Sequence, residues 1–257
     1  MQARLALVTG AGTGLGRAAA LRLARAGADV AILSRTREEL EEVAGDIESM
    51  GRRALVLVAD TSSEAQMRKA FTSIAEQFGR LDFVFANAGI NGTWAPIEEL
   101  TYEEWNKTVS INLGGTFLTL HLAVPLMQEH GGAILITSSI NGTRTFTTAG
   151  ASAYSTTKAG QVALMQMAAL ELARYRIRVN AICPGAIESE IDDNTERRNT
   201  EDARVPADYP AGKVPLTGGK PGTSEEVAEL VLFLASDRSR HISGTPVWID
   251  GAQSLLV

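Results

Sequence analysis

The sequence predicts an α/β fold with one doubly wound parallel sheet of about seven strands and helices on both faces. Short runs that are apolar almost throughout recur along the chain, as buried parallel strands require. Between them, apolar side chains step by three or four residues, as at Leu40, Val43 and Ile47, which is typical of an amphipathic helix on a sheet. Repeated strand–helix alternation favours right-handed crossovers and therefore a parallel sheet. The expected strands are 5–9, 29–33, 54–59, 82–86, 133–137, 177–182 and 247–249.

Composition and charge are those of a single globular domain. The 257 residues are 45% hydrophobic and 21% charged, and a net charge of −6 gives no reason to bind nucleic acid or an anionic membrane. No run approaches the roughly 18 consecutive apolar residues of a membrane helix, and 4–10 is too short for a signal peptide. Cys183 is the only cysteine, which indicates a buried structural thiol and a cytoplasmic protein. The three histidines are scattered, so no metal site is expected.

One segment, 188–213, differs from the rest of the chain. It is polar and weakly periodic, with eight acidic residues against three arginines up to Asp208. A disordered loop is one interpretation. We favour a substrate lid, because the segment follows the carboxyl end of a predicted strand, where open α/β sheets bind ligands. The chain is therefore expected to form one domain over 1–257, with the lid at about 188–213.

A glycine-rich turn follows the first predicted strand and leads directly into a helix. It has the spacing T-G-x-x-x-G-x-G, from Thr9 to Gly16. Glycines let the backbone turn sharply and approach a pyrophosphate, whose charge is met by free N–H groups and the positive helix end. A turn without a ligand is the alternative, but its place between a strand and a helix favours dinucleotide binding. The residues expected to bind are Gly10, Thr13, Gly14, Leu15 and Gly16.

The residues that read the adenosine ribose are expected about 20 positions further on, at the end of the second strand. Ser34 and Arg35 stand there. A carboxylate would bind a free 2′-hydroxyl, whereas a hydroxyl and a guanidinium suit a 2′-phosphate. We therefore expect NADP as the cofactor, with NAD possible. The alternative is that Arg35 is a solvated residue at a helix start.

Further motifs follow in order along the chain. They are Asn87-Ala88-Gly89, Asn112, Ser138-Ser139, Tyr154-Ser155-Thr156-Thr157-Lys158, Asn180 with Pro184-Gly185, and Asp250-Gly251. Together with the glycine turn, they make essentially the whole chain resemble the short-chain dehydrogenase/reductase family. The resemblance implies a Rossmann-like fold, a nicotinamide cofactor and the interconversion of a carbonyl compound and an alcohol.

Tyr154 and Lys158 are four residues apart in a predicted helix over 153–175, so they share one face. A free tyrosine has a pKa near about 10, and a cation roughly 4 Å away lowers it by up to ~3 units. Tyr154 is thereby suited to act as general acid in reduction and general base in oxidation. Ser139 is expected to close the fifth strand, where its hydroxyl would hydrogen-bond the reacting oxygen. The resemblance implies that Lys158 also holds the nicotinamide ribose.

The resemblance extends to further residues. Asn112 would anchor a water in a proton relay, although an isolated asparagine is more often a helix cap. Asp60, with Thr61, would bind the adenine, and Asn87, Ala88 and Gly89 would support the adenosine side. The nicotinamide amide would contact Pro184, Gly185, Ile187 and Ser189.

The chain departs from the family pattern at Ser189 and at Ala252, where threonine and glycine are usual. The interval of 15 residues from Ser139 to Tyr154 is longer than in the commonest members. An insertion around 144–151 is therefore expected to reshape one wall of the substrate pocket.

The favoured function is NADP(H)-dependent interconversion of a ketone and a secondary alcohol. One alternative is a 3-oxoacyl-[acyl-carrier-protein] reductase, which shares these motifs. Such an enzyme docks an acidic carrier, yet 127–130 and the position of Leu170 offer no lysine or arginine, and the lid is acidic. We therefore expect a small free substrate. A non-catalytic cofactor sensor or scaffold is another alternative, disfavoured because Ser139, Tyr154 and Lys158 are all present.

Two predicted helices, near 112–129 and 154–175, carry more apolar surface than one sheet face can cover. In the resembling family such helices pair across a two-fold axis. We therefore expect a homo-oligomer, specifically a homotetramer.

Overall fold

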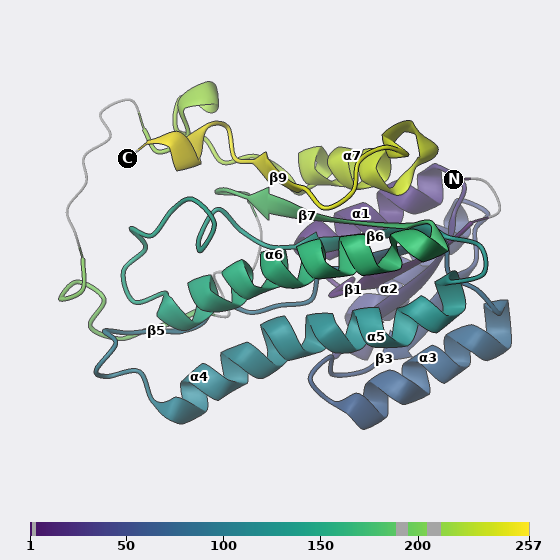
Figure 1. Cartoon of the computed structure of the whole chain (residues 1–257), viewed down its shortest axis with the longest axis horizontal. Helices are drawn as coiled ribbons and strands as arrows, with labels where there is room; N and C mark the ends of the chain where they lie inside the picture. The colour runs from purple at the N-terminus through teal and green to yellow at the C-terminus, as the bar shows by residue number, and fades with distance from the viewer. Residues whose placement is uncertain (2–3, 189–194, 205–211, 257) are drawn as a thin grey trace.

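A parallel seven-stranded sheet forms the centre of the molecule (Figure 1), in a computed structural model that describes residues 1, 4–188, 195–204 and 212–256. Its strand order is β3-β2-β1-β4-β6-β7-β9. Each expected strand is present, with its ends within two residues of the predicted ones. The strands are β1 (Leu5–Thr9), β2 (Asp29–Ser34), β3 (Ala54–Val58), β4 (Phe83–Ala86), β6 (Gly132–Thr137), β7 (Ile177–Pro184) and β9 (Pro246–Ile249).

Helices cover both faces of the sheet, as predicted (Figure 1). On one face lie α1 (Gly14–Arg25), α2 (Arg37–Ser49) and α7 (Ser224–Ala235). On the other lie α3 (Glu64–Phe78), α5 (Gly115–Met127) and α6 (Ser152–Leu172). Leu40 and Val227 pack into the first core and Met67 and Met165 into the second, and all four are fully buried. Burial of both faces accounts for the uninterrupted apolarity of the strands.

The order of the strands reverses between β1 and β4. From β1 the chain winds outward through β2 to β3, then returns to β4 on the other side of β1. Val8 of β1 therefore lies in register with Ile32 on one side and Phe85 on the other. The crossover segments that leave these strands diverge, so a crevice opens at their carboxyl ends.

A second, two-stranded parallel sheet was not predicted. It pairs β5 (Gly92–Trp94) with β8 (Thr195–Arg197), which lies inside the expected lid. Asn91 Nδ2 donates to Thr195 Oγ1 at 2.7 Å, and Thr93 Oγ1 donates to Glu196 Oε2 at 3.1 Å. Strands of three residues carry no readable periodicity, which explains why the pattern gave no sign of them. Residues 189–194 and 205–211 of the lid lie outside the described residues.

An ion pair fixes the described middle of this segment to α4 (Tyr102–Val109). Arg198 donates to both carboxylate oxygens of Glu104, at 2.9 and 3.1 Å, and to the carbonyl of Glu99 at 2.6 Å. Glu104 also closes a capping box with Thr101 at the start of α4. The Arg198 hydrogen bond, followed by that of the Thr101 backbone, lowers the pKa of Glu104 to about 2. The residues around β8 are therefore anchored to the body of the domain.

The stretch Tyr102–Met127 is long and apolar enough to cross a membrane, judged by length and composition alone. It includes α4, a π-helical turn (Ser110–Gly114) and α5. The sequence did not predict a candidate membrane span here, although a helix near 112–129 was expected, because no unbroken apolar run marks the stretch. In the fold α4 packs on α6 and α5 on α3, and core helices have this same composition.

Candidate active site

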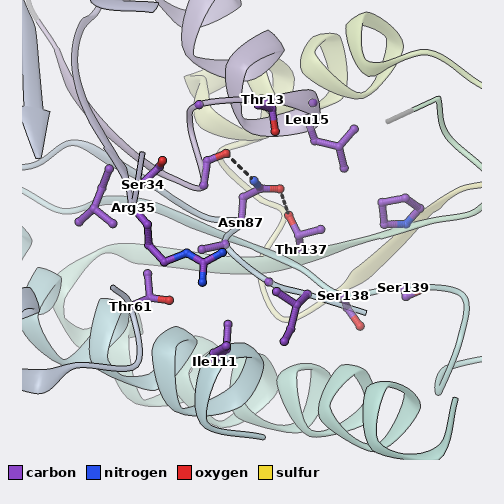
Figure 2. A pocket seen from close by; sticks show the side chains of 18 of the residues that line it. Thr13, Leu15, Ser34, Arg35, Thr61, Asn87, Ile111, Thr137, Ser138 and Ser139 are labelled. Carbon is purple, nitrogen blue, oxygen red and sulfur yellow. Dashed lines mark hydrogen bonds between the residues drawn. The ribbon is translucent and has the colours of Figure 1, made fainter. Parts of the chain in front are cut away.

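A cavity of about 420 Å³ occupies the crevice at the carboxyl ends of the strands (Figure 2). It runs from the glycine turn to the start of α6 and brings together most of the residues predicted from the sequence. Those predicted residues that line it are Gly10, Thr13, Gly14, Leu15, Ser34, Arg35, Asp60, Thr61, Asn87, Ala88, Gly89, Ser139, Tyr154, Lys158, Pro184, Gly185 and Ile187. Ser189 lies outside the described residues.

The glycine turn requires glycine for two different reasons. Gly10 and Gly14 have positive φ values of 66° and 50°, which other residues adopt only at a cost in strain. Gly16 is buried behind the turn, where a β-carbon would collide with the carbonyl oxygen of Gly10. Gly16 therefore permits the close approach of α1 to β1, whereas the prediction had placed it among the cofactor-contacting residues.

Asn87 ties the ends of three strands together beneath this turn. Its Nδ2 donates to the carbonyls of Thr9 and Gly10 at 3.2 and 3.4 Å, and its Oδ1 accepts from Thr137 Oγ1 at 3.0 Å (Figure 2). Thr9 Oγ1 accepts from the backbone N–H groups of Asn87 and Ala88 at 3.0 and 3.1 Å. These bonds hold β1, β4 and β6 in place beneath the turn, and the amino end of the helix that follows is the kind of site that presents N–H groups to an anion.

The side chain of Arg35 extends into the cavity (Figure 2). Within the described part of the chain, no hydrogen bond or ion pair holds its guanidinium. Burial acts to raise the pKa of nearby Asp60, but hydrogen bonds from Ser62 and the charge of Arg35 outweigh it and lower that pKa. Arg35, Ser34 and Asp60 thus form a polar end to the cavity that suits a ribose, an adenine and a phosphate.

Glu39 also lines this end of the cavity, and sequence reasoning missed it. It lies in the first turn of α2, and its carboxylate sits where a β-carbon on Gly12 would point. Nothing in the local sequence brings Glu39 to the glycine turn, because the contact arises from the packing of α2 beside α1, which the turn leads into. The other unpredicted lining residues are Gly12, Leu33, Thr36, Ala59, Ile90, Ile111, Thr137 and Ser138.

Tyr154 and Lys158 lie side by side at the start of α6 and are almost fully buried, with 8% and 3% of their surfaces exposed. Lys158 Nζ is 5.4 Å from the centroid of the Tyr154 ring and donates to the carbonyl of Thr137 at 2.8 Å. Burial lowers the pKa of Lys158 to about 8, and the neighbouring Cys183 thiol acts weakly in the opposite direction. At neutral pH the site therefore holds a buried cation beside a phenol.

Ser139 lies two residues beyond the end of β6, in the following loop, rather than closing the strand as expected. Its Oγ accepts from the backbone N–H of Asn141 at 3.1 Å, which leaves its own proton available. Ser138 differs, because its Oγ donates to the carbonyl of Lys158 at 2.8 Å. Only Ser139 of the two has a hydroxyl proton without a described acceptor.

Asn112 does not line the cavity. It is fully buried in the π-helical turn, where its Oδ1 accepts from Ile90 N at 2.8 Å and its Nδ2 donates to Ile90 O and Thr157 Oγ1 at 2.9 and 3.2 Å. A helix cap, the alternative considered from the sequence, is wrong because the residue lies inside a continuous helical stretch. A β-carbon on Gly89 would lie 3.1 Å from Asn112 Oδ1 and 3.6 Å from Lys158 Nζ, so Gly89 keeps these two groups close.

The loop from Ser139 to α6 is held by contacts with the sheet edge. Thr143 Oγ1 donates to the Ser139 carbonyl at 2.6 Å and accepts from Trp248 Nε1 at 3.3 Å. The guanidinium of Arg144 stacks 3.5 Å above the Trp248 ring. Cys183 is buried beside this loop, as predicted, and burial raises the pKa of its thiol.

Fold and cavity together define an α/β nucleotide-binding protein with a Ser, Tyr and Lys cluster at one end of the nucleotide crevice. A family model described as "Enoyl-(Acyl carrier protein) reductase" matches residues 10–252. The chain belongs to the short-chain dehydrogenase/reductase family, as its motifs predicted, and is an oxidoreductase acting on CH–OH groups.

Three relatives illustrate the similarity. Levodione reductase of Leifsonia aquatica is 40% identical over 260 residues, which span 98% of this chain and 94% of that protein. The crystal structure of a 3-ketoacyl-ACP reductase from Sinorhizobium meliloti 1021 is 58% identical, with a TM-score of 0.95, and covers 98% of this chain and 100% of its own. The 3-ketoacyl-(acyl-carrier-protein) reductase of Brucella melitensis complexed with NADH is 30% identical, with a TM-score of 0.86, over 98% of this chain and 99% of its own. The predicted fold is confirmed, as is binding of a nicotinamide dinucleotide.

Proposed function

We propose that this enzyme interconverts a ketone and a secondary alcohol with NADP(H), using Ser139, Tyr154 and Lys158. The observation that carries the proposal is the geometry at one end of the cavity. There, the available hydroxyl of Ser139 and the buried Tyr154–Lys158 pair line the same crevice as the glycine turn. A dinucleotide held in this crevice would supply or accept the hydride.

The three side chains divide the remaining work. In reduction, the Tyr154 hydroxyl donates its proton to the substrate oxygen, and in oxidation the phenolate takes the proton from the alcohol. The Lys158 ammonium favours the phenolate form through its charge. The Ser139 hydroxyl donates a hydrogen bond to the same oxygen and holds it beside Tyr154. Asn112 supports this arrangement through its hydrogen bonds with Ile90 and Thr157. We also propose that it anchors a water in a proton relay.

The glycine turn and the residues around Arg35 would hold the cofactor. Gly10, Thr13 and Gly14 offer backbone groups to the pyrophosphate, and Asp60 with Thr61 offers acceptors to the adenine. Pro184, Gly185 and Ile187 line the opposite end and would contact the nicotinamide. NADP is preferred over NAD because no described residue pairs with the Arg35 guanidinium and Ser34 carries no charge.

A small, free ketone or alcohol is the proposed substrate. Leu170, where a carrier protein would dock, is uncharged, and the lid sequence from 188 to 208 carries eight acidic residues against three arginines. The 58% identity to a structure titled as a 3-ketoacyl-ACP reductase favours the second candidate, reduction of carrier-bound 3-oxoacyl groups.

One assay separates these functions. The purified enzyme is supplied with NADPH or NADH and a panel of ketones, a short 3-oxoacyl thioester and the same acyl group on carrier protein, and loss of nicotinamide absorbance is followed. The proposal expects turnover of a free ketone, with NADPH preferred. A kcat/KM at least tenfold higher for the carrier-bound group would establish the second candidate instead. No turnover of any substrate would favour a cofactor sensor or scaffold.

We further propose a cytoplasmic homotetramer built from single-domain subunits. Phe117, Met167 and Leu170 on α5 and α6 are 52%, 70% and 81% exposed, which is unusual for large apolar side chains on one subunit. Pairing of these helices with those of other copies would cover them. Light scattering at micromolar concentration tests this, and a monomeric mass would contradict it.

A further inference from the structure

A second cavity, of about 480 Å³, lies at the opposite edge of the sheet from the cofactor crevice. Its walls come from segments that lead into β1, β4, β6 and β7, together with the turn after α7. Because all these strands are parallel, their amino ends gather at this one edge. The lining residues are Arg4, Arg80, Asp82, His130, Gly131, Gly132, Ala173, Arg176, Ile177, Arg178, Ala235, Asp237, Arg240 and Ser243.

The charge of this cavity is opposite to that of the whole chain. Five arginines face two aspartates, an excess of three positive charges, while the chain carries a net charge of −6. A recessed cluster of like charges focuses the electrostatic field and concentrates anions. Long solvated arginines on a convex surface would not have this effect.

Both aspartates are committed to structural contacts. The Asp82 carboxylate is bonded to Arg80 and accepts from the backbone N–H of Leu5 at 2.8 Å. Asp237 Oδ2 is 2.6 Å from an Arg4 nitrogen. Each aspartate thus neutralises one arginine, which leaves Arg176, Arg178 and Arg240 without a carboxylate partner among the described residues.

Several guanidinium N–H groups in the cavity lack acceptors. Arg80 Nε is buried and has no hydrogen-bond partner within the described ranges. Arg176 has one described acceptor, the Glu129 carbonyl at 3.0 Å, and Arg240 has none. Arg178 is bound to backbone carbonyls, and its pKa is lowered by burial and by Arg4, with Asp237 acting against them. Arg176 and Arg240 are exposed, so their guanidinium N–H groups are open to solvent and can reach a ligand in the cavity.

The backbone that surrounds the cavity is tightly packed. Arg176 has a φ of +59°, an uncommon conformation for an arginine, and follows the short helical turn after α6. A β-carbon on Gly131 would lie 2.7 Å from the Arg176 carbonyl oxygen, and one on Gly132 would collide with the Asp82 backbone. Glycine at 131 and 132 therefore lets the chain before β6 pack closely against the backbone of Arg176 and Asp82.

We propose that this cavity is a binding site for a small anion carrying two phosphate groups, about the size of inorganic pyrophosphate. The planar guanidinium forms paired hydrogen bonds that match phosphate oxygens. The three uncompensated charges match the charge of pyrophosphate at neutral pH. This site lies outside the catalytic crevice, so the proposal does not depend on which substrate the enzyme reduces.

The test is isothermal titration of sodium pyrophosphate into the enzyme whose cofactor crevice is saturated with NADPH. The expected result is one site per chain. Arg240→Gln should weaken it at least roughly fivefold, and Arg176→Gln combined with Arg240→Gln at least tenfold, since each removes a charge-assisted donor. Arg240 is exposed and makes no described ion pair, so its substitution leaves folding intact.

Two variants serve as controls. Arg238→Gln removes an exposed arginine from the same short turn but not from the cavity, and Arg35→Ala alters only the cofactor crevice. Both should bind pyrophosphate within about twofold of the wild type. An equal loss in Arg238→Gln, a loss in Arg35→Ala, or no saturable binding to the wild type would overturn the proposal. Tighter binding of citrate than of pyrophosphate would overturn the choice of phosphate.

Discussion

The two ends of the sheet solve the problem of binding an anion in different ways. At the carboxyl end, the cofactor crevice is built from backbone N–H groups and short neutral side chains such as Thr9 and Asn87. Among its described residues, Lys158 is the one charged side chain that is nearly fully buried. At the amino end, the second cavity is built from long arginine side chains paired in part with aspartates. Helix amino ends face only the first of these edges, because each helix follows the carboxyl end of a strand. Where the amino ends of helices are lacking, the edge of a parallel sheet therefore needs charged side chains to bind an anion.

The largest effect is expected at Tyr154. Replacement by phenylalanine keeps the ring and removes the proton that the reaction transfers, so turnover should fall by about 10² or more. Cofactor affinity, measured by fluorescence titration, should change little because the glycine turn is untouched. Near-normal turnover would show that the proton comes from another group.

The buried charge of Lys158 makes stability depend on pH. Its pKa is about 8 in the folded protein, below its ordinary value of 10.5, so between these values the unfolded chain holds a proton that the folded chain lacks. The free energy of unfolding should therefore rise by roughly 3 kcal/mol as the pH increases from about 8 to 10.5. Below pH 8 the folded protein bears the full cost of burying the Lys158 charge. Lys158→Met should remove this rise. Urea unfolding of both proteins without cofactor measures it, and identical pH profiles would contradict it.

Among the described residues, Arg35 is the only arginine that lines the crevice. Arg35→Ala should raise the KM for NADPH far more than that for NADH, through loss of a contact worth about 1.5–3 kcal/mol. Initial rates with each cofactor give the two constants. A wild-type preference for NADH, or equal effects on both constants, would contradict the assignment and point to Glu39 as the residue that reads the ribose.

The smallest effects are expected from replacing two glycines by alanine, which should change the stability of the fold in opposite directions. Gly16→Ala forces a β-carbon against the Gly10 carbonyl and should destabilise the fold by about 1–3 kcal/mol. Gly45→Ala lies in the middle of α2 with nothing within 4 Å of the new carbon, so it should stabilise by up to about 1 kcal/mol. Thermal unfolding of the two variants checks both signs. Destabilisation by Gly45→Ala would show that α2 does not tolerate even an open-space substitution.

The sequence predicted the sheet well because burial on both faces imposes a simple pattern on each strand. It also located the cavity residues that follow strand ends, such as Ser34 and Asn87. Contacts that depend on packing between distant segments escaped it. Glu39 reaches Gly12 only because α2 packs beside α1, and the side chain of Asn112 turns to Ile90 because a π-helical turn, which no motif marks, carries it. The three-residue strands β5 and β8 were missed for want of any periodicity.

The small β5–β8 sheet has a consequence for exchanging segments between this enzyme and its relatives. Arg198 N donates to the Trp94 carbonyl, and Ala95 N donates to the Gly150 carbonyl. Three segments that are distant in sequence therefore form one hydrogen-bonded belt. The third of these segments is the loop that begins at Ser139. A belt of this kind behaves as a single module. Exchanging the middle segment, around Trp94 and Ala95, with that of a relative would disturb hydrogen bonds to both of the others, so the three segments are best exchanged together.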